Sequence, residues 1–79
     1  MMEIVFSRHA KLKLGQRKIS RELVLETIDE PEFSVMGRNF REELHRRFGQ
    51  NYLKVVVEKG NDKIFVITAH WVAKFKYKG

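Results

Sequence analysis

Five residues in the second half of the chain have the side-chain types that cleave RNA without a metal ion: His45, Arg47, Tyr52, Lys54 and His70. Such cleavage needs a base for the 2′-hydroxyl proton, an acid for the leaving 5′-oxygen, and cations that stabilise the charge on the phosphate. Histidine titrates near neutral pH and suits the proton transfers, whereas Arg47 and Lys54 are suited to hold the phosphate. Tyr52 is suited to stack on a base or to donate a proton. The sequence therefore predicts a catalytic cluster, provided that the fold brings these side chains together.

Whether it does depends on a β-hairpin predicted between residues 52 and 71. Two runs rich in β-branched and aromatic residues flank the segment Gly60-Asn61-Asp62, which is typical of a hairpin turn. A three-residue loop would make Lys59 oppose Lys63 and Val57 oppose Phe65. The hairpin would then have one largely apolar face, made of Leu53, Val55, Val57, Phe65, Ile67, Ala69 and Trp71.

The same register places Tyr52, Lys54 and His70 together on the opposite, polar face. A two-residue loop would instead turn His70 toward Leu53 and mix polar with apolar residues on both faces. Because the hydrophobic pattern normally fixes the register of a strand pair, we favour the three-residue loop. Taken singly, each histidine is more typical of an ordinary exposed strand residue than of a catalytic one, and the argument for catalysis rests on the collection.

The strand predicted before the hairpin runs from Phe40 to Phe48 and alternates in polarity. Its even positions include Phe40, Leu44 and Phe48, whereas its odd positions are all polar, namely Arg41, Glu43, His45 and Arg47. If Leu44 and Phe48 join the apolar face of the hairpin, His45 and Arg47 join the polar one. A further short strand is predicted before it, over residues 33–38.

Two helices are predicted in the first half of the chain. Ser7 is a candidate N-cap for a helix from Arg8 to about Arg17, and Ser20 for a second helix over residues 21–28 that Pro31 terminates. The apolar positions expected to pack are Ala10 and Leu14 with Leu12 beside them, and then Leu23, Val24, Leu25 and Ile28.

These elements predict an α+β fold in which two N-terminal helices pack on one face of a three- to five-stranded, mainly antiparallel sheet. A short strand over residues 3–6 precedes the helices, and no linker, repeat or low-complexity tract divides the chain. We therefore expect one domain over residues 1–79, with the second sheet face left for a ligand or solvent.

The net charge of +6 favours a polyanionic partner, and nucleic acid is the first candidate. Residues 41–79 carry nine basic and four acidic groups, which makes this the basic half. The candidate nucleic-acid-binding residues are Arg41, Arg46, Lys74 and Lys76. The tail over residues 72–78 alternates lysine with aromatic residues, which fits a basic arm but better fits a lysine-bearing edge strand with Phe75 and Tyr77 packed inward.

Several classes of protein are disfavoured by what the sequence lacks. There is no cysteine, so disulfides and thiolate metal sites are excluded and a cytoplasmic location is expected. No apolar run approaches the roughly 20 residues that span a bilayer. The three histidines lie far apart in sequence and His9 is expected to be structural, so we predict neither a metal nor a cofactor.

Five short segments resemble the RelE/ParE-like toxin superfamily, with BrnT-like proteins and a related family of short domains beginning Ser-Arg-His-Ala as the nearest branches. The segments are Ser7-Arg8-His9-Ala10, Arg17-Lys18-Ile19-Ser20, Glu30-Pro31-Glu32, residues 53–57 and residues 64–68. In BrnT-like relatives the last strand carries a Ser-Ala-Arg-Arg type of motif, where this chain has Thr68-Ala69-His70-Trp71. Where this chain has Lys18, a glycine is more common in relatives.

The resemblance implies a RelE-like fold and a toxin of a type II toxin–antitoxin pair that cleaves RNA, possibly on the ribosome, and is paired with a cognate antitoxin. We expect that antitoxin to be acidic, since it has to mask a basic face. Two alternatives stay open: a non-catalytic nucleic-acid- or protein-binding module of the same fold, and a gyrase poison of the ParE kind.

Overall fold

The structure is a computed structural model and describes residues 2–72. Along the chain the elements are β1 (Glu3–Phe6), α1 (Arg8–Arg17), α2 (Arg21–Asp29), β2 (Phe33–Met36), a short 3-10 helix (Arg38–Phe40), β3 (Arg41–Phe48), β4 (Asn51–Lys59) and β5 (Lys63–Val72). Among these residues no helix is long and apolar enough to cross a membrane. The predicted inward packing of Phe75 and Tyr77 lies outside the described residues.

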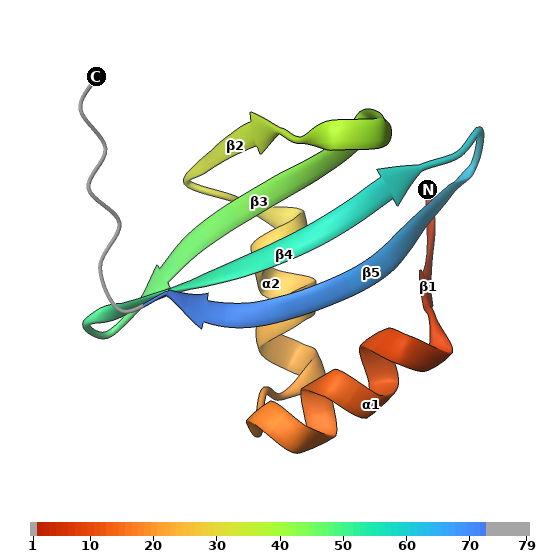
Figure 1. The fold of residues 1–79 in the computed structure, drawn as a ribbon. Helices are drawn as coiled ribbons and strands as arrows, with labels where there is room; N and C mark the ends of the chain where they lie inside the picture. Colours follow the sequence, from red (N-terminus) through yellow and green to blue (C-terminus); the bar gives the residue numbers. More distant parts are fainter. Residues whose placement is uncertain (1, 73–79) are drawn as a thin grey trace.

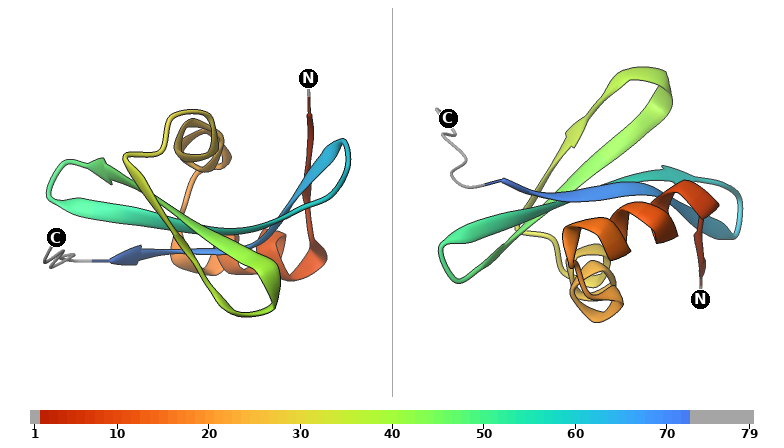
Figure 2. Two further views of the ribbon diagram at one scale, coloured as in Figure 1. Left: turned by 90° about the horizontal axis from the view of Figure 1, so that it is seen from above. Right: turned by 60° about the horizontal axis from the view of Figure 1, so that its bottom comes forward.

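All five strands form one sheet in the order β1-β5-β4-β3-β2, and both helices cover the same face of it (Figures 1 and 2). Only β1 and β5 run parallel, whereas the other neighbours are antiparallel. Helix α1 packs against β5, and α2 packs against β4 and β3. The predicted α+β arrangement is therefore confirmed.

Serine side chains begin both helices, as predicted. The Ser7 hydroxyl accepts a hydrogen bond of 3.0 Å from the backbone N–H of Ala10, and the Ser20 hydroxyl accepts one of 3.2 Å from that of Leu23. Each satisfies a backbone donor that has no partner within the helix. The short connection between the caps keeps the two helices side by side on the sheet.

The helices bury fewer of their apolar residues than the sequence predicts. Helix α1 buries Ala10 and Leu14, but Leu12 is 58% exposed because it projects from the side of the helix that faces solvent. In α2 the buried positions are Val24 and Thr27, whereas Leu25 is exposed.

Between the helices and the sheet lies one hydrophobic core. Its buried members are Phe6, Ala10, Leu14, Ile19, Val24, Leu44, Leu53, Val55, Val57, Val66 and Ala69. Removing this apolar surface from water is the main source of stability in so small a fold. Trp71 is partly buried against it, with its ring meeting that of Phe48 edge-on at 6.3 Å.

The predicted three-residue loop of the β4–β5 hairpin is wrong. The Gly60 N–H donates to the Lys63 carbonyl at 2.8 Å, so the loop has two residues, and Val57 pairs with Val66. Val66 consequently points into the core, whereas Phe65, which we predicted there, is 36% exposed.

A β-bulge then restores the predicted faces in the rest of the hairpin. The register shifts between Val56 and Val57: Val57 pairs with Val66, but Val56 pairs with Thr68, so Ile67 is the extra residue. Beyond the bulge His70 pairs with Lys54, on the face away from the helices. The two-residue loop without this bulge would have turned His70 into the core.

The β2–β3 connection also differs from the prediction. Strand β2 ends at Met36 rather than at residue 38, and Phe40 lies in the turn instead of in β3. Both Asn39 and Phe40 have positive φ angles, of 59° and 61°, which reverse the chain within three residues. As a result the Phe40 side chain is 89% exposed and takes no part in the core.

Candidate active site

Four side chains form a row across the sheet face that the helices leave uncovered. In the strand register Phe33 of β2 pairs with His45 of β3, His45 with Lys54 of β4, and Lys54 with His70 of β5. Directly paired residues on one face have Cβ atoms about 4.5–5.5 Å apart. The predicted meeting of His45, Lys54 and His70 on one face is therefore confirmed. We call these three residues together with Phe33 the His–Lys–His row.

At one end of the row lies a group of rings. The imidazole of His45 stacks on the ring of Phe33, with 4.5 Å between centroids and 12° between planes, and Tyr52 meets Phe33 at 5.8 Å. We predicted an exposed His45, but its side chain is buried, with only 1% of its surface exposed. Phe33 was not among the predicted site residues, since no feature of its own short strand indicates which ring it will meet.

An ion pair crosses the row. Lys54 Nζ lies 3.6 Å from Glu43 Oε1, and both side chains are partly buried. Glu43 belongs to the polar side of β3, as its odd position predicts, but the sequence did not identify it as a partner of Lys54. Its carboxylate opposes the effect of the Lys54 charge on both histidines.

Both histidines of the row are shifted toward the neutral form. Burial lowers the pKa of His45, and the Lys54 charge lowers it further, while the Glu43 backbone and carboxylate oppose these effects. Burial also lowers the pKa of His70, followed by the charges of Lys54 and Arg17, with Glu43 again opposing. A neutral imidazole at pH 7 is able to accept a proton, so His70, which is only half-buried, is suited to act as a base.

Arg17 is a site residue that the sequence analysis missed. Its Nη1 donates to the Ala69 carbonyl at 2.8 Å and to the Thr68 hydroxyl at 3.3 Å, although Arg17 belongs to α1. The contact joins residues 51 and 52 positions apart, and no local pattern predicts it. It brings a guanidinium to the β5 end of the row.

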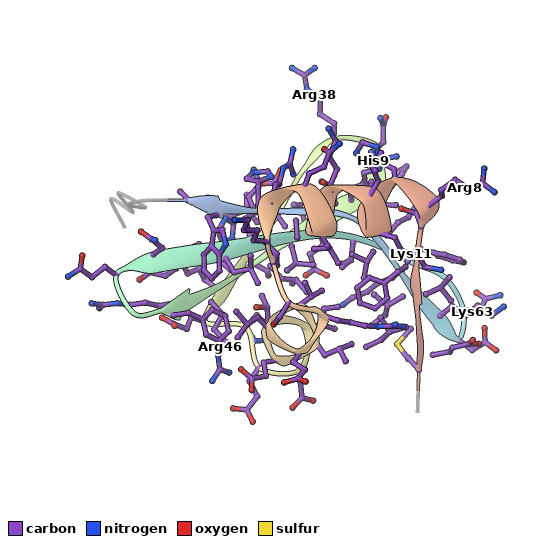
Figure 3. The ribbon with its side chains drawn as sticks, turned by 90° about the horizontal axis from the view of Figure 1, so that it is seen from below. Arg8, His9, Lys11, Arg38, Arg46 and Lys63 are labelled. Atoms are coloured by element: carbon purple, nitrogen blue, oxygen red, sulfur yellow. The ribbon has the colours of Figure 1, made fainter. Side chains whose placement is uncertain are left out.

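Of the other predicted site residues, Arg47 lies on the same face as the row, whereas Arg46 lies on the opposite face. Arg47 is on the same face, next to Tyr52 in the register, and its Nε donates to the Gly49 carbonyl at 2.8 Å. Arg41 is exposed at the start of β3. Arg46 lies on the helix face beside α2 (Figure 3), where its Nη1 donates to the Glu30 carbonyl at 3.0 Å. Lys74 and Lys76 lie outside the described residues.

Charge is divided between the two helices rather than only between the two halves of the chain. From Arg8 to Lys18 there are five basic residues and no acidic ones, whereas from Glu22 to Glu32 there are five acidic residues and no basic ones. Figure 3 shows Arg8, His9 and Lys11 projecting from α1. Helix α1 is therefore a second basic surface. The net charge of the first half of the chain does not reveal it, because the acidic residues of α2 cancel the basic residues of α1.

Within residues 2–72, no group of three or more histidine, aspartate or glutamate side chains is arranged to hold a metal ion. The row and its neighbours Tyr52 and Arg17 offer imidazoles, an ammonium, a phenol and a guanidinium. These groups are able to transfer protons and to hold an anion.

The fold and the row define an α+β protein with its helices on one sheet face and a titratable row on the other. Residues 6–71 match the model of a family described as "Domain of unknown function (DUF4258)", and the chain belongs to that family. The matched range contains every residue of the row together with Arg17. No curated protein and no solved structure matches the chain. The resemblance to RelE/ParE-like toxins stays a prediction.

Proposed function

We propose that this protein is a metal-independent ribonuclease and the toxin of a type II toxin–antitoxin pair, acting on messenger RNA in the cytoplasm. The observation that carries the proposal is the His–Lys–His row, because it sets a half-buried histidine directly opposite a lysine on an open sheet face.

In the proposed reaction His70 takes the proton from a ribose 2′-hydroxyl. The 2′-oxygen then attacks the adjacent phosphorus, the bond from phosphorus to the 5′-oxygen breaks, and Tyr52 gives its phenolic proton to that oxygen. The products are a 2′,3′-cyclic phosphate and a free 5′-hydroxyl: one proton has moved from the RNA to His70 and one from Tyr52 to the RNA. Transfer of a proton from the His70 imidazolium to the Tyr52 phenolate through water restores the starting enzyme. Lys54 stabilises the added negative charge on the phosphate.

His45 has a supporting role in this proposal. It is buried and stacked on Phe33, so it does not contact RNA directly. Together with Phe33 it packs beside Tyr52 and so fixes the position of the proposed acid. Of the predicted catalytic residues, His70, Lys54 and Tyr52 are therefore assigned to the chemistry, and Arg47 to binding the RNA strand next to them.

The experiment is a cleavage assay with end-labelled RNA in EDTA. Wild-type protein is compared with His70→Ala and Tyr52→Phe, and with His9→Ala as a matched histidine control on the exposed surface of α1. We expect loss of at least a hundredfold in rate for the first two variants and none for the control. Cleavage of an all-deoxy substrate, or cleavage that survives His70→Ala, would contradict the mechanism.

A second candidate function is nucleic-acid binding without turnover. It is favoured by the five basic residues from Arg8 to Lys18, which belong to α1 and its C-cap, whereas the row lies on the sheet face that the helices leave uncovered. This alternative predicts salt-dependent RNA binding with no cleavage products under any condition.

An acidic antitoxin is proposed as the partner, since a protein of net charge +6 gains association rate and specificity from an anionic one. Co-expression with the product of the neighbouring gene tests this directly. We expect the two proteins to co-purify and the complex to be inactive on RNA.

A further inference from the structure

In the described part of the chain, the second half of β5 has no strand along its outer edge. Strand β1 pairs only with residues 63–66 of β5, so among the described residues no strand lies beside the remainder. Groups of α1 and its cap bond to this edge instead: the Ser7 hydroxyl donates to the Ile67 carbonyl at 3.5 Å, and Arg17 Nη1 donates to the Ala69 carbonyl at 2.8 Å. Arg17 is thus anchored to the sheet.

From this anchor the guanidinium reaches the face that carries the row. Thr68 pairs with Val56, whereas the next pair along the strands, Val55 and Ala69, points into the core. The Thr68 side chain therefore points away from the helices, and its hydroxyl accepts from Arg17 at 3.3 Å. His70 lies two residues further along β5, on the same face.

Arg17 also retains donors for a ligand. Both of its hydrogen bonds to described residues use Nη1, while a guanidinium has N–H groups on three nitrogens. The Thr68 hydroxyl, which accepts from Arg17, keeps its own proton to donate. The Nε and Nη2 groups of Arg17 and the hydroxyl of Thr68 are therefore three donors that suit the oxygens of a phosphate.

The charges around the row favour an anion at this end. Lys54 is paired with Glu43, and Lys59 with Glu42, whereas no carboxylate of the described residues lies within 4.0 Å of the Arg17 guanidinium. The positive charge of Arg17 also contributes to the lowered pKa of His70. An anion bound between the two would remove that unfavourable interaction.

We infer that Arg17, Thr68 and His70 form a binding subsite for a phosphate group of RNA at the outer edge of β5. The inference rests on the proposed function for the identity of the phosphate, but the subsite is testable without cleavage. Arg17 then holds the phosphate next to His70, a role that the sequence suggested for Arg47 and Lys54.

The test uses NMR to titrate the His70 ring with inorganic phosphate and adenosine 5′-monophosphate as probes. We expect saturable binding that raises the pKa of His70, because a bound anion stabilises the imidazolium. Arg17→Gln should weaken binding by roughly tenfold, which is the loss expected for a charge-assisted hydrogen bond. Lys11→Gln, which removes the same charge from the exposed side of α1, should leave binding unchanged.

Thr68→Val provides a second variant that keeps the shape of the strand if Arg17→Gln disturbs the fold. It should also weaken phosphate binding. An unchanged phosphate affinity in both variants, or a His70 pKa that does not respond to phosphate, would overturn the subsite. Phosphate binding without RNA cleavage would overturn the proposed function but leave the subsite intact, so the two failures are distinguishable.

Discussion

Lys54 of β4 and Glu43 of β3 form an ion pair of 3.6 Å, and β4 lies between the two strands that carry His45 and His70. The carboxylate raises the pKa of each histidine, whereas the ammonium lowers it. Neutralising the carboxylate should therefore lower both histidine pKa values further. Glu43→Gln with NMR titration of His45 and His70 measures this effect.

The matched control is Glu42→Gln. Glu42 is the adjacent residue in β3, but its carboxylate points to the helix face and pairs with Lys59 at 3.0 Å. Removing it should leave both histidine pKa values as they are. An equal shift in the two variants would mean that overall charge, rather than the local ion pair, determines the titration of the row.

The lowered pKa values of His45 and His70 predict that acid destabilises the fold. In the unfolded chain a histidine has a pKa near 6.5, and His45 and His70 both titrate below this value in the folded protein. At a pH between the folded and the unfolded pKa of each histidine, the unfolded chain binds more protons than the folded protein. The contribution of these histidines to stability is therefore complete above pH 6.5, and the free energy of unfolding falls as the pH drops below that value. Urea unfolding at pH 7.5, 6.5 and 5.5 checks the sign.

Replacing both histidines provides the comparison for this experiment. The double variant His45→Gln and His70→Gln should unfold with a flatter dependence on pH in this range. Each unit by which a folded pKa lies below the unfolded one corresponds to about 1.4 kcal/mol once the pH is below both. Stability that rises as the pH falls through 6.5 would contradict the structure.

Helix α1 ends on a residue in a conformation that favours glycine. Lys18 has a φ of 54° and a ψ of 45°, and the Ile19 N–H bonds back to the Leu14 carbonyl at 3.0 Å. A Cβ in this left-handed conformation costs about 1 kcal/mol. Lys18→Gly should therefore raise the free energy of unfolding by up to about 1 kcal/mol, measured by urea denaturation.

Lys18→Ala is the control for that substitution, because it removes the same charged side chain but keeps the Cβ. We expect no gain from it. If alanine stabilises the protein as much as glycine does, the effect comes from the loss of a positive charge in a basic helix instead of from the backbone.

The sequence was sufficient for the elements, their caps and the polarity of β3, because each depends on local periodicity or on a single capping side chain. It was insufficient for the hairpin register. The predicted face of His70 was right although the predicted loop was wrong, because Ile67 adds one residue that offsets the shorter loop. Nothing in a run of β-branched residues indicates where a bulge will occur.

Contacts between distant segments were the other part that the sequence did not reveal. The bond from Arg17 to Ala69 and the stacking of Phe33 on His45 depend on how α1 and β2 sit against the sheet. The two-residue repeat of a strand gives the face of a side chain, but not the layer that covers it. That is why His45 was predicted on the correct face but with the wrong exposure.

Adjacent arginines of β3 should contribute to different properties, because neighbouring strand residues point to opposite faces. Arg46 donates to the Glu30 carbonyl at 3.0 Å, lies 3.9 Å from the Glu30 carboxylate and has its guanidinium over the Phe48 ring. It therefore fastens the end of α2 to the sheet. Arg46→Gln should lower the free energy of unfolding by about 1 kcal/mol, since most of its partly exposed ion pair is screened by water.

The same substitution should leave RNA affinity within about twofold of the wild type. In contrast, Arg47→Gln should weaken RNA binding but lower the free energy of unfolding by no more than a few tenths of a kcal/mol, about the change expected for a surface substitution. Filter binding at fixed salt and urea unfolding of both variants measure the two properties side by side. If Arg46→Gln weakens RNA binding while the protein remains folded, the RNA-binding surface extends to the helix face, and the separation of the two faces by function is wrong.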